Sequence, residues 1–165
     1  MRTQKQQVGD SGEKEIVRHA PCPNCGKKLT GLPKNYPLYD VQCEGCSFRA
    51  QVKTSKSNSK STVRGAGWDI IHKVLKAGFM SPPLIVNFNP PNRNQEILFF
   101  PFVPRSCLTK YRLSKNHRQA NYAMFDYCGL DELPHFRLAK KGNKRFWMVN
   151  KEPKIKKYKI DCEPL

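Results

Sequence analysis

Acidic residues are scarce in this sequence. Only 13 Asp and Glu stand against 30 Lys and Arg, which gives a formal net charge of +17 over 165 residues. A chain with so little negative charge repels itself unless an anion is near, and the commonest large polyanion is nucleic acid. An anionic membrane is the competing partner. The sequence lacks both a run of 18 apolar residues and a basic amphipathic helix, which argues against the membrane.

A signal peptide is also missing, because the first residues, MRTQKQQVGDSGEKE, contain no apolar stretch. We therefore expect a cytoplasmic protein, associated with the nucleoid if the source is prokaryotic. In such a reducing compartment, paired cysteines bind metal more often than they form disulfides. The cysteines number seven, and an odd count cannot make a complete disulfide framework.

The length suits one ordinary domain, and the sequence has no internal repeat. We expect residues 1–9 to be disordered and the polar Ser/Lys/Asn tract at 55–65 to be a loop. Helices are predicted over residues 11–19 and within 66–78, the second ending at Gly78. Strands are predicted from about residue 39 and over residues 48–54, 83–88, 96–103, 120–127 and 144–150, with a basic Gly-Asn hairpin turn at 142–143. This order predicts a mixed α/β domain with one sheet.

Four of the cysteines form two closely spaced pairs. Cys22-x-x-Cys25 is followed after 17 residues by Cys43-x-x-Cys46. Each pair can bind one Zn²⁺ ion from a tight turn, and two pairs complete a tetrahedral sulfur site with no open position. Four buried free thiols would not explain the doubled spacing. We therefore predict a structural zinc ribbon within residues 21–47, whose metal binding contributes to folding. The remaining cysteines, Cys107, Cys128 and Cys162, are interpreted as core or surface residues.

A carboxylate, an amide and a lysine flank the second cysteine pair. Side chains alternate along a strand, so Gln51 and Lys53 should project from one face. If residues 43–46 turn a hairpin, Asp40 lies opposite the end of the second strand and the three side chains can converge. Two oxygen ligands and a lysine at one point suit Mg²⁺-dependent phosphodiester hydrolysis, in which the lysine orients or deprotonates the water. The competing interpretation of this spacing is an ordinary half-buried strand with a surface lysine.

The residues around the cysteine pairs resemble a known family. PCPNCG and YDVQCEGCSFRAQVKTSKSNSKSTVRGAGWDIIHKV are similar to the catalytic domain of the DpnI-type restriction endonucleases, the Dam-replacing family of the PD-(D/E)xK superfamily. The similarity is strongest over residues 21–75 and weaker beyond, as in RQANYAMFDY. It implies one α/β nuclease domain over residues 1–165, with a mixed sheet flanked by helices and an inserted zinc ribbon. By this resemblance Asp40 matches the metal-binding aspartate, Gln51 the second acidic position and Lys53 the catalytic lysine.

The sequence departs from this family in two respects. Gln51 stands where the family has Glu or Asp, so the site loses one negative charge and should bind Mg²⁺ more weakly. Glutamine does occur at this position elsewhere in the superfamily. The family also carries a C-terminal winged-helix domain that reads DNA, and the 165 residues do not include one. Any sequence recognition is therefore expected to come from the one domain.

The resemblance also implies further site residues. A glutamate on the first helix often assists the metal site in this superfamily. Glu13 and Glu15 are the candidates, and we take Glu15 as the catalytic one; helix capping and surface charge are the alternative. Cations and hydroxyls just after Lys53 would lie on the phosphate backbone, and a segment near residue 120 would read base edges. The alternative for the segment after Lys53 is a solvated loop without DNA contacts, and the alternative for Tyr122 is a buried core residue. The predicted DNA contacts are Lys56, Lys60, Arg64, Arg118, Gln119, Asn121 and Tyr122.

A basic tail over residues 140–159 carries nine Lys or Arg and should make DNA binding steeply salt-dependent. Together these patterns predict a Mg²⁺-dependent, type II-like DNA endonuclease with a structural Zn²⁺, in which Mn²⁺ can replace Mg²⁺. The resemblance implies adenine-methylated GATC in double-stranded DNA as the target. We expect a monomer or weak dimer, with no membrane partner. The alternative is a zinc-ribbon DNA-binding module without catalysis, in which Gln51 marks a decayed site. A nuclease indifferent to methylation is the third possibility.

Overall fold

A computed structural model describes residues 4–111 and 123–153. The helices in these ranges are α1 (Gln4–His19) and α2 (Trp68–Lys76), with short 3-10 turns η1 (Arg105–Cys107) and η2 (Leu130–Glu132). The strands are β1 (Leu29–Gly31), β2 (Val41–Cys43), β3 (Arg49–Ser55), β4 (Val63–Ala66), β5 (Leu84–Phe88), β6 (Glu96–Phe100), β7 (Leu108–Tyr111), β8 (Met124–Tyr127), β9 (His135–Lys141) and β10 (Lys144–Lys151). No helix in the described ranges is long and apolar enough to cross a membrane.

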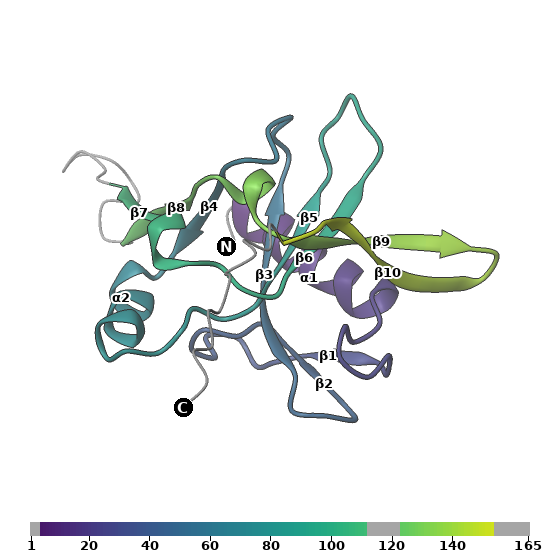
Figure 1. The fold of residues 1–165 in the computed structure, drawn as a ribbon, viewed down its shortest axis with the longest axis horizontal. Helices are drawn as coiled ribbons and strands as arrows, with labels where there is room; N and C mark the ends of the chain where they lie inside the picture. Colours follow the sequence, from purple (N-terminus) through teal and green to yellow (C-terminus); the bar gives the residue numbers. More distant parts are fainter. Residues whose placement is uncertain (1–3, 112–122, 154–165) are drawn as a thin grey trace, which may run out of the picture.

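The strands form two sheets (Figure 1). The larger has seven strands in the order β1-β2-β3-β5-β6-β9-β10, and the smaller has three in the order β4-β8-β7. β3 and β5 run parallel, while the other paired strands run antiparallel. The predicted mixed α/β class is confirmed, but the expectation of a single sheet is wrong.

The smaller sheet includes β4, which falls at the end of the polar tract that we expected to be a loop. Val63 of this strand is only 2% exposed. A Cβ atom at Gly65 would lie 2.7 Å from Cζ of Phe125, so the strand approaches that ring closely because residue 65 has no side chain. Val63 and Gly65, the two buried positions of β4, make this short strand part of the core. The polar residues before them hide the strand pattern in the sequence.

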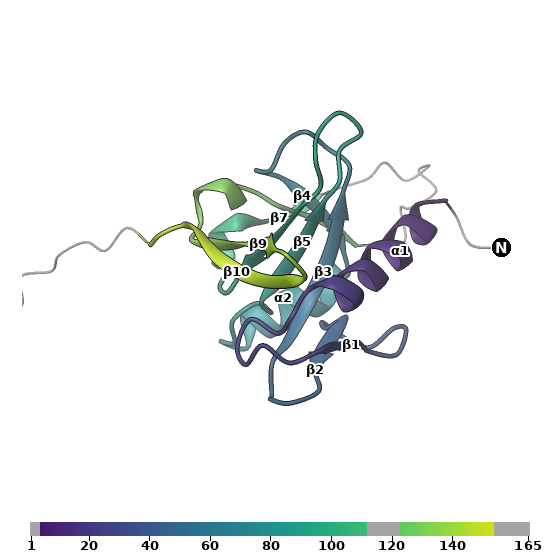
Figure 2. The ribbon, with the colours of Figure 1, turned by 90° about the vertical axis from the view of Figure 1, so that its right-hand side faces the viewer.

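Helix α1 begins at Gln4, not at residue 11, so residues 4–9, which we expected to be disordered, form its first turns. Gln and Lys favour helices, and no proline interrupts this segment. In Figure 2, α1 runs diagonally beside β3, with β1 and β2 on its other side. The position of α1 matters for function, because one of its faces borders the loop that leads from β1 to β2.

Two hydrophobic cores lie on the two faces of the larger sheet. On one face, Val52 and Ile85 pack with Ile16 of α1. On the other face, Val86 packs with Phe125 and with neighbours in the smaller sheet and α2. Side chains alternate along β3, so Gln51 and Lys53 leave it on the face opposite to Val52. The predicted alternation of this strand is confirmed by the way its neighbours pack.

The β9–β10 hairpin turns at Gly142, as the Gly-Asn pair predicts, with a positive φ of 59°. Trp147 of β10 packs against Phe99 with the ring centroids 5.7 Å apart. Its indole Nε1 donates a hydrogen bond of 2.8 Å to the carbonyl oxygen of Pro21. The hairpin is therefore fastened to the first cysteine turn, more than a hundred residues earlier in the chain.

Candidate active site and metal centre

The four paired cysteines meet at one point, as their spacing predicts. Their sulfur atoms all lie within 4.8 Å of one another. Cys22 Sγ is 3.6 Å from Cys46 Sγ, and Cys25 Sγ is 3.4 Å from Cys43 Sγ. A tetrahedral Zn–S₄ centre with bonds of about 2.3 Å places its sulfurs roughly 3.8 Å apart. The cluster can therefore hold a metal such as zinc.

Amide groups of both cysteine turns donate to the sulfurs. Asn24 N lies 3.4 Å from Cys22 Sγ, Gly45 N lies 3.2 Å from Cys43 Sγ, and Asn24 Nδ2 lies 3.4 Å from Cys46 Sγ. The side-chain amide of Asn24 is the main cause that lowers the pKa of Cys46 to about 6. Burial raises the pKa of Cys22 to about 12, so a thiolate there needs a cation beside it. The donor set thus suits a thiolate-bound metal ion.

Strands β2 and β3 separate next to this cluster, and Asp40 fills the fork between them. β2 pairs with β3 only over two residues, the last pair being Val41 and Ala50. Asp40 N donates to Ala50 O at 3.0 Å, and Asp40 Oδ2 accepts a hydrogen bond of 2.7 Å from Val52 N. The carboxylate takes the place of the next backbone partner of β3. Its position is therefore fixed at the point where the edge of β3 becomes open.

Gln51 lies on the inner face of β3 beside this fork. It is 9% exposed, and its Oε1 accepts a hydrogen bond from the hydroxyl of Tyr127 in β8. Burial, and secondarily the carboxylate of Asp40, raise the pKa of Tyr127, which keeps the hydroxyl protonated and shows that it lies in the field of Asp40. An amide oxygen has two lone pairs, so Oε1 can accept this hydrogen bond and still bind a ligand.

Glu13 of α1 also belongs to this group of charges. Its pKa is raised from 4.5 to about 7, first by loss of solvent and then by the carboxylates of Asp40 and Asp10, while Lys53 acts in the opposite direction. Three acidic groups therefore lie close enough to repel one another, and two lysines act on them: Lys53, and Lys34, which forms an ion pair with Asp10. A divalent cation at this place would relieve the repulsion.

Glu15, which we predicted as the catalytic glutamate, lies elsewhere. Its carboxylate accepts hydrogen bonds from Asn87 Nδ2 at 3.0 Å and Gln95 Nε2 at 2.6 Å. The buried line of α1 runs through Gly12, where a Cβ atom would overlap Thr54 of β3, and on to the next turn. Residues 13 and 15 lie about 80° to either side of that line. The two glutamates therefore point to opposite flanks of the helix, and only Glu13 points to the fork.

A cavity of about 460 Å³ opens over the fork. It is lined by Gln6, Asp10, Glu13, Leu32, Pro33, Lys34, Asn35, Tyr36 and Asp40. Within residues 4–111 and 123–153, only the four cysteines bring three or more Cys, His or carboxylate ligand atoms within 4.8 Å. The fork is thus no closed cage. Mg²⁺ is commonly bound by one or two carboxylates together with waters and phosphate oxygens, so an open site of this composition fits it.

The predicted DNA contacts divide into two groups. Lys60 forms an ion pair with Glu96, Arg64 forms one with Asp126 (Nε to Oδ1, 2.9 Å), and Lys56 is exposed. The other four, Arg118, Gln119, Asn121 and Tyr122, lie outside the described residues. All seven therefore stay predictions, and two of them already have an acidic partner within the protein.

Comparison with protein families gives a match that covers most of the chain. The family described as DpnI, the Dam-replacing family, matches residues 1–141. The matched range contains the cysteine cluster, the fork at Asp40 and the whole of α1 through β8, well over half of the chain. Such a family indicates a restriction-type nuclease that binds and acts on methylated DNA. The chain therefore belongs to the DpnI, or Dam-replacing, family.

Proposed function

We propose that this protein is a Mg²⁺-dependent endonuclease that cuts double-stranded DNA at adenine-methylated GATC sites and holds a structural Zn²⁺ in its cysteine cluster. The observation that supports it most strongly is that Asp40 is fixed at the open edge of β3 by its hydrogen bond from Val52 N, with Glu13 in the electrostatic field of both Asp40 and Lys53. An ordinary half-buried strand would need no acidic cluster there. Family membership supports the methylated-DNA target.

Each residue at the fork has a role in this proposal. Asp40 and Gln51 would hold Mg²⁺, which when bound polarises the scissile phosphate and lowers the pKa of its water. Lys53 orients the attacking water and stabilises the negative charge that develops on the phosphate. Glu13, with a pKa of about 7, accepts a proton from that water at neutral pH. Tyr127 holds the amide of Gln51 in place.

This assignment keeps the PD-(D/E)xK pattern implied by the resemblance and changes one residue in it. Glu13 replaces Glu15 as the acidic residue from the first helix, because Glu15 is bound by two amides on the other flank. Gln51 retains the second metal position, with one negative charge fewer than the family pattern.

The decisive test uses plasmid DNA from Dam-positive and Dam-negative hosts, with Mg²⁺, Mn²⁺ or neither. We expect cleavage of the Dam-methylated plasmid only, and only with a divalent ion. Lys53→Ala should lower the cleavage rate by about 10²- to 10⁴-fold while zinc content and DNA binding stay close to those of the unchanged protein. The matched control is Lys73→Ala on α2, an exposed lysine that should have no effect.

A non-catalytic DNA-binding module remains the second candidate. The specific observation in its favour is that Gln51 is uncharged and its oxygen already accepts a hydrogen bond from Tyr127. DNA binding without any nicking in either metal ion would establish this candidate. Equal cleavage of the two plasmids would keep the nuclease and remove the preference for methylated sites.

A further inference from the structure

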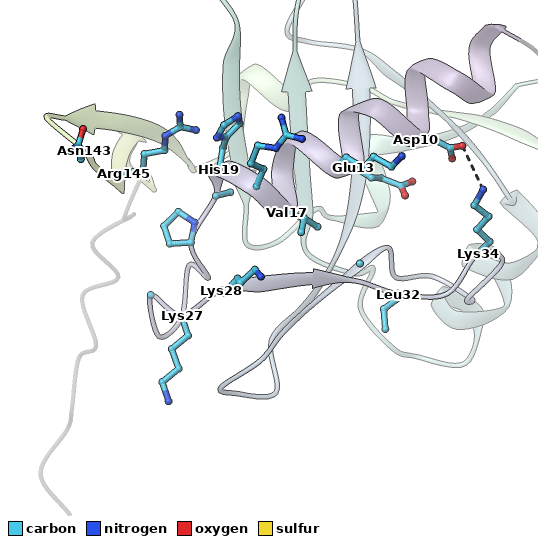
Figure 3. A pocket seen from close by; sticks show the side chains of 16 residues that line it. Asp10, Glu13, Val17, His19, Lys27, Lys28, Leu32, Lys34, Asn143 and Arg145 are labelled. Carbon is cyan, nitrogen blue, oxygen red and sulfur yellow. Dashed lines mark ion pairs between the residues drawn. The ribbon is translucent and has the colours of Figure 1, made fainter.

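A second and larger cavity lies beside the fork, between α1 and the cysteine cluster. Its volume is about 1040 Å³. Helix α1 forms one wall, and the segment from the first cysteine turn through β1 forms the other (Figure 3). Asn143 and Arg145 of the β9–β10 hairpin stand at the end far from Asp10 and Lys34. The cavity is therefore a groove with walls from three separate parts of the chain, and we call it the α1–ribbon groove.

The α1–ribbon groove is strongly basic. Its lining includes two acidic residues, Asp10 and Glu13, both at the end next to the fork. The cationic lining residues are Lys14, Arg18, Lys27, Lys28, Lys34 and Arg145. His19 reports the resulting field, because burial and then the neighbouring Arg145 and Arg18 lower its pKa. A groove of this composition attracts an extended anion, because it has many more cationic side chains than one phosphate group would need.

The cysteine cluster fixes the ribbon wall of this groove. Cys22 N donates to Lys27 O at 2.7 Å, and Glu44 N donates to Lys28 O at 3.0 Å. Residues 27 and 28 are thus hydrogen-bonded to both cysteine turns. In Figure 3, Lys28 lies along the start of β1 beneath α1, whereas the side chain of Lys27 points away from the helix. Lys28 is therefore the cation that the metal site positions against α1.

The opposite end of the groove is fixed in a similar way. Arg145 lies on β10 two residues before Trp147, whose indole is hydrogen-bonded to Pro21. Arg145 and His19 stand next to each other at this end in Figure 3. The hairpin thus places a cation from the C-terminal third of the chain beside the last turn of α1.

The α1–ribbon groove and the cavity over the fork are continuous. They share four lining residues: Asp10, Glu13, Leu32 and Lys34. Lys34 Nζ and Asp10 Oδ2 form an ion pair of 3.7 Å across the junction. A polymer whose phosphate lies at Asp40 can therefore pass the Lys34–Asp10 ion pair and continue along α1 into the basic part of the groove, at Arg18 and Lys28.

We propose that the α1–ribbon groove binds the sugar–phosphate backbone of the DNA that flanks the cleaved bond. The zinc ribbon is then one wall of the DNA-binding surface as well as a support for the fold. This inference rests on the proposed function, because it takes the same duplex as substrate. It assigns to Arg18, Lys28 and Arg145 phosphate contacts that the sequence did not suggest.

The test is a binding measurement that needs no cleavage. A labelled duplex of about 30 base pairs with one central methylated GATC is titrated at several salt concentrations, without added Mg²⁺ and without chelator, so that zinc is retained. The groove variant is Arg18→Gln/Lys28→Gln. The matched control is Lys73→Gln/Lys76→Gln on α2, which also removes two exposed positive charges.

We expect the groove variant to reduce the slope of log K against log salt concentration by about 2. Its affinity at physiological salt should fall roughly tenfold or more. The α2 control should stay within about twofold of the unchanged protein. On a duplex trimmed to about 12 base pairs, the difference between the unchanged protein and the groove variant should shrink, because the flanking phosphates are missing. The charge-keeping variant Arg18→Lys/Lys28→Arg should bind like the unchanged protein.

Unchanged binding by the groove variant would overturn the inference, and so would an equal loss in the α2 control, which would show a general effect of net charge. The same conclusion would follow if the charge-keeping variant lost binding as strongly as the Gln variant. These readouts are independent of catalysis. A protein that binds through the groove but never cuts DNA would refute the proposed function alone, and a groove variant that binds normally would refute the groove alone.

Discussion

The two candidate metal sites of this protein lie at the two ends of one short strand, and they differ in almost every respect. β2 spans Val41–Cys43; Cys43 closes it on the ribbon side, and Asp40 precedes it on the other. At the cysteine end, four sulfurs lie within 4.8 Å and backbone amides donate to them. At the aspartate end, the proposed ligands are one carboxylate and one amide, and a cavity opens above the carboxylate of Asp40. One site is complete without a substrate, and the other is not.

This difference explains why the proposed function assigns chemistry to the aspartate end alone. A closed thiolate site has no free coordination position, so its metal ion can act only through the residues that it holds in place and not on a substrate directly. A metal ion at the open fork would keep positions free for phosphate oxygens and water, and without that ion the fork must tolerate unneutralised negative charge. The raised pKa of Glu13 reflects its burial and the nearby negative charges of Asp40 and Asp10. Because the ribbon holds β2, the stable site fixes the position of the unstable one.

Breaking the cysteine site should produce the largest effect. We expect Cys43→Ser to lose bound zinc and to destabilise the fold by several kcal/mol, because the free energy of metal binding is part of the free energy of folding. Cys43 also ends β2, so Asp40 should lose its fixed position and cleavage should disappear with the metal. Metal content by atomic absorption and thermal unfolding by circular dichroism measure the two effects.

The control for this variant is Cys107→Ser, at a partly exposed cysteine outside the cluster. It should retain the full zinc content and unfold within a few degrees of the unchanged protein. A Cys43→Ser protein that lost zinc yet unfolded at the usual temperature would contradict the assigned role, since the ribbon would then hold β2 without its metal.

Restoring the charge that the fork lacks should strengthen its binding of Mg²⁺. Gln51→Glu adds a carboxylate beside Asp40, so we expect Mg²⁺ to support half-maximal cleavage at a concentration about tenfold lower. Tyr127→Phe should act in the opposite direction, because Gln51 then loses the hydroxyl that holds its amide. The measurement is the rate of plasmid cleavage against Mg²⁺ concentration. An unchanged Mg²⁺ requirement in Gln51→Glu would show that residue 51 does not bind the ion.

The two sites also differ in how far the sequence predicts them. The Cys-x-x-Cys pairs specify their own geometry, since each turn has few conformations and four thiolates suit one ion. The face of Gln51 follows equally well from the two-residue period of a strand. Both arguments use only local chain geometry, and both predictions agree with the structure.

What the sequence missed depends on contacts between distant segments. β4 is a strand because Gly65 packs on Phe125, sixty residues later, and the sequence near the polar tract does not predict that contact. The choice between Glu13 and Glu15 depends on which side of α1 faces β3. Gly12 and Ile16 mark that side, four residues apart, and a helical projection through them would have separated the two glutamates.

Glu13 offers the smallest effect and the most specific test of the open site. Its pKa is about 7 in the folded protein against 4.5 when free of these surroundings. Between pH 4.5 and 7 the folded state therefore binds more protons than the unfolded state, so stability should fall as pH rises through this window and level off above it. The group is only partly buried and screened by solvent, so the change in unfolding free energy is on the order of 1 kcal/mol.

Urea unfolding of the zinc-loaded protein at several pH values from about 5 to 8 measures this change. Glu13→Gln should remove most of the pH dependence and be the more stable protein at high pH, while Mg²⁺ should reduce the dependence in the unchanged protein only. If the Gln variant kept the full slope, the charge repulsion would lie elsewhere, and the fork would have no electrostatic reason to bind a cation.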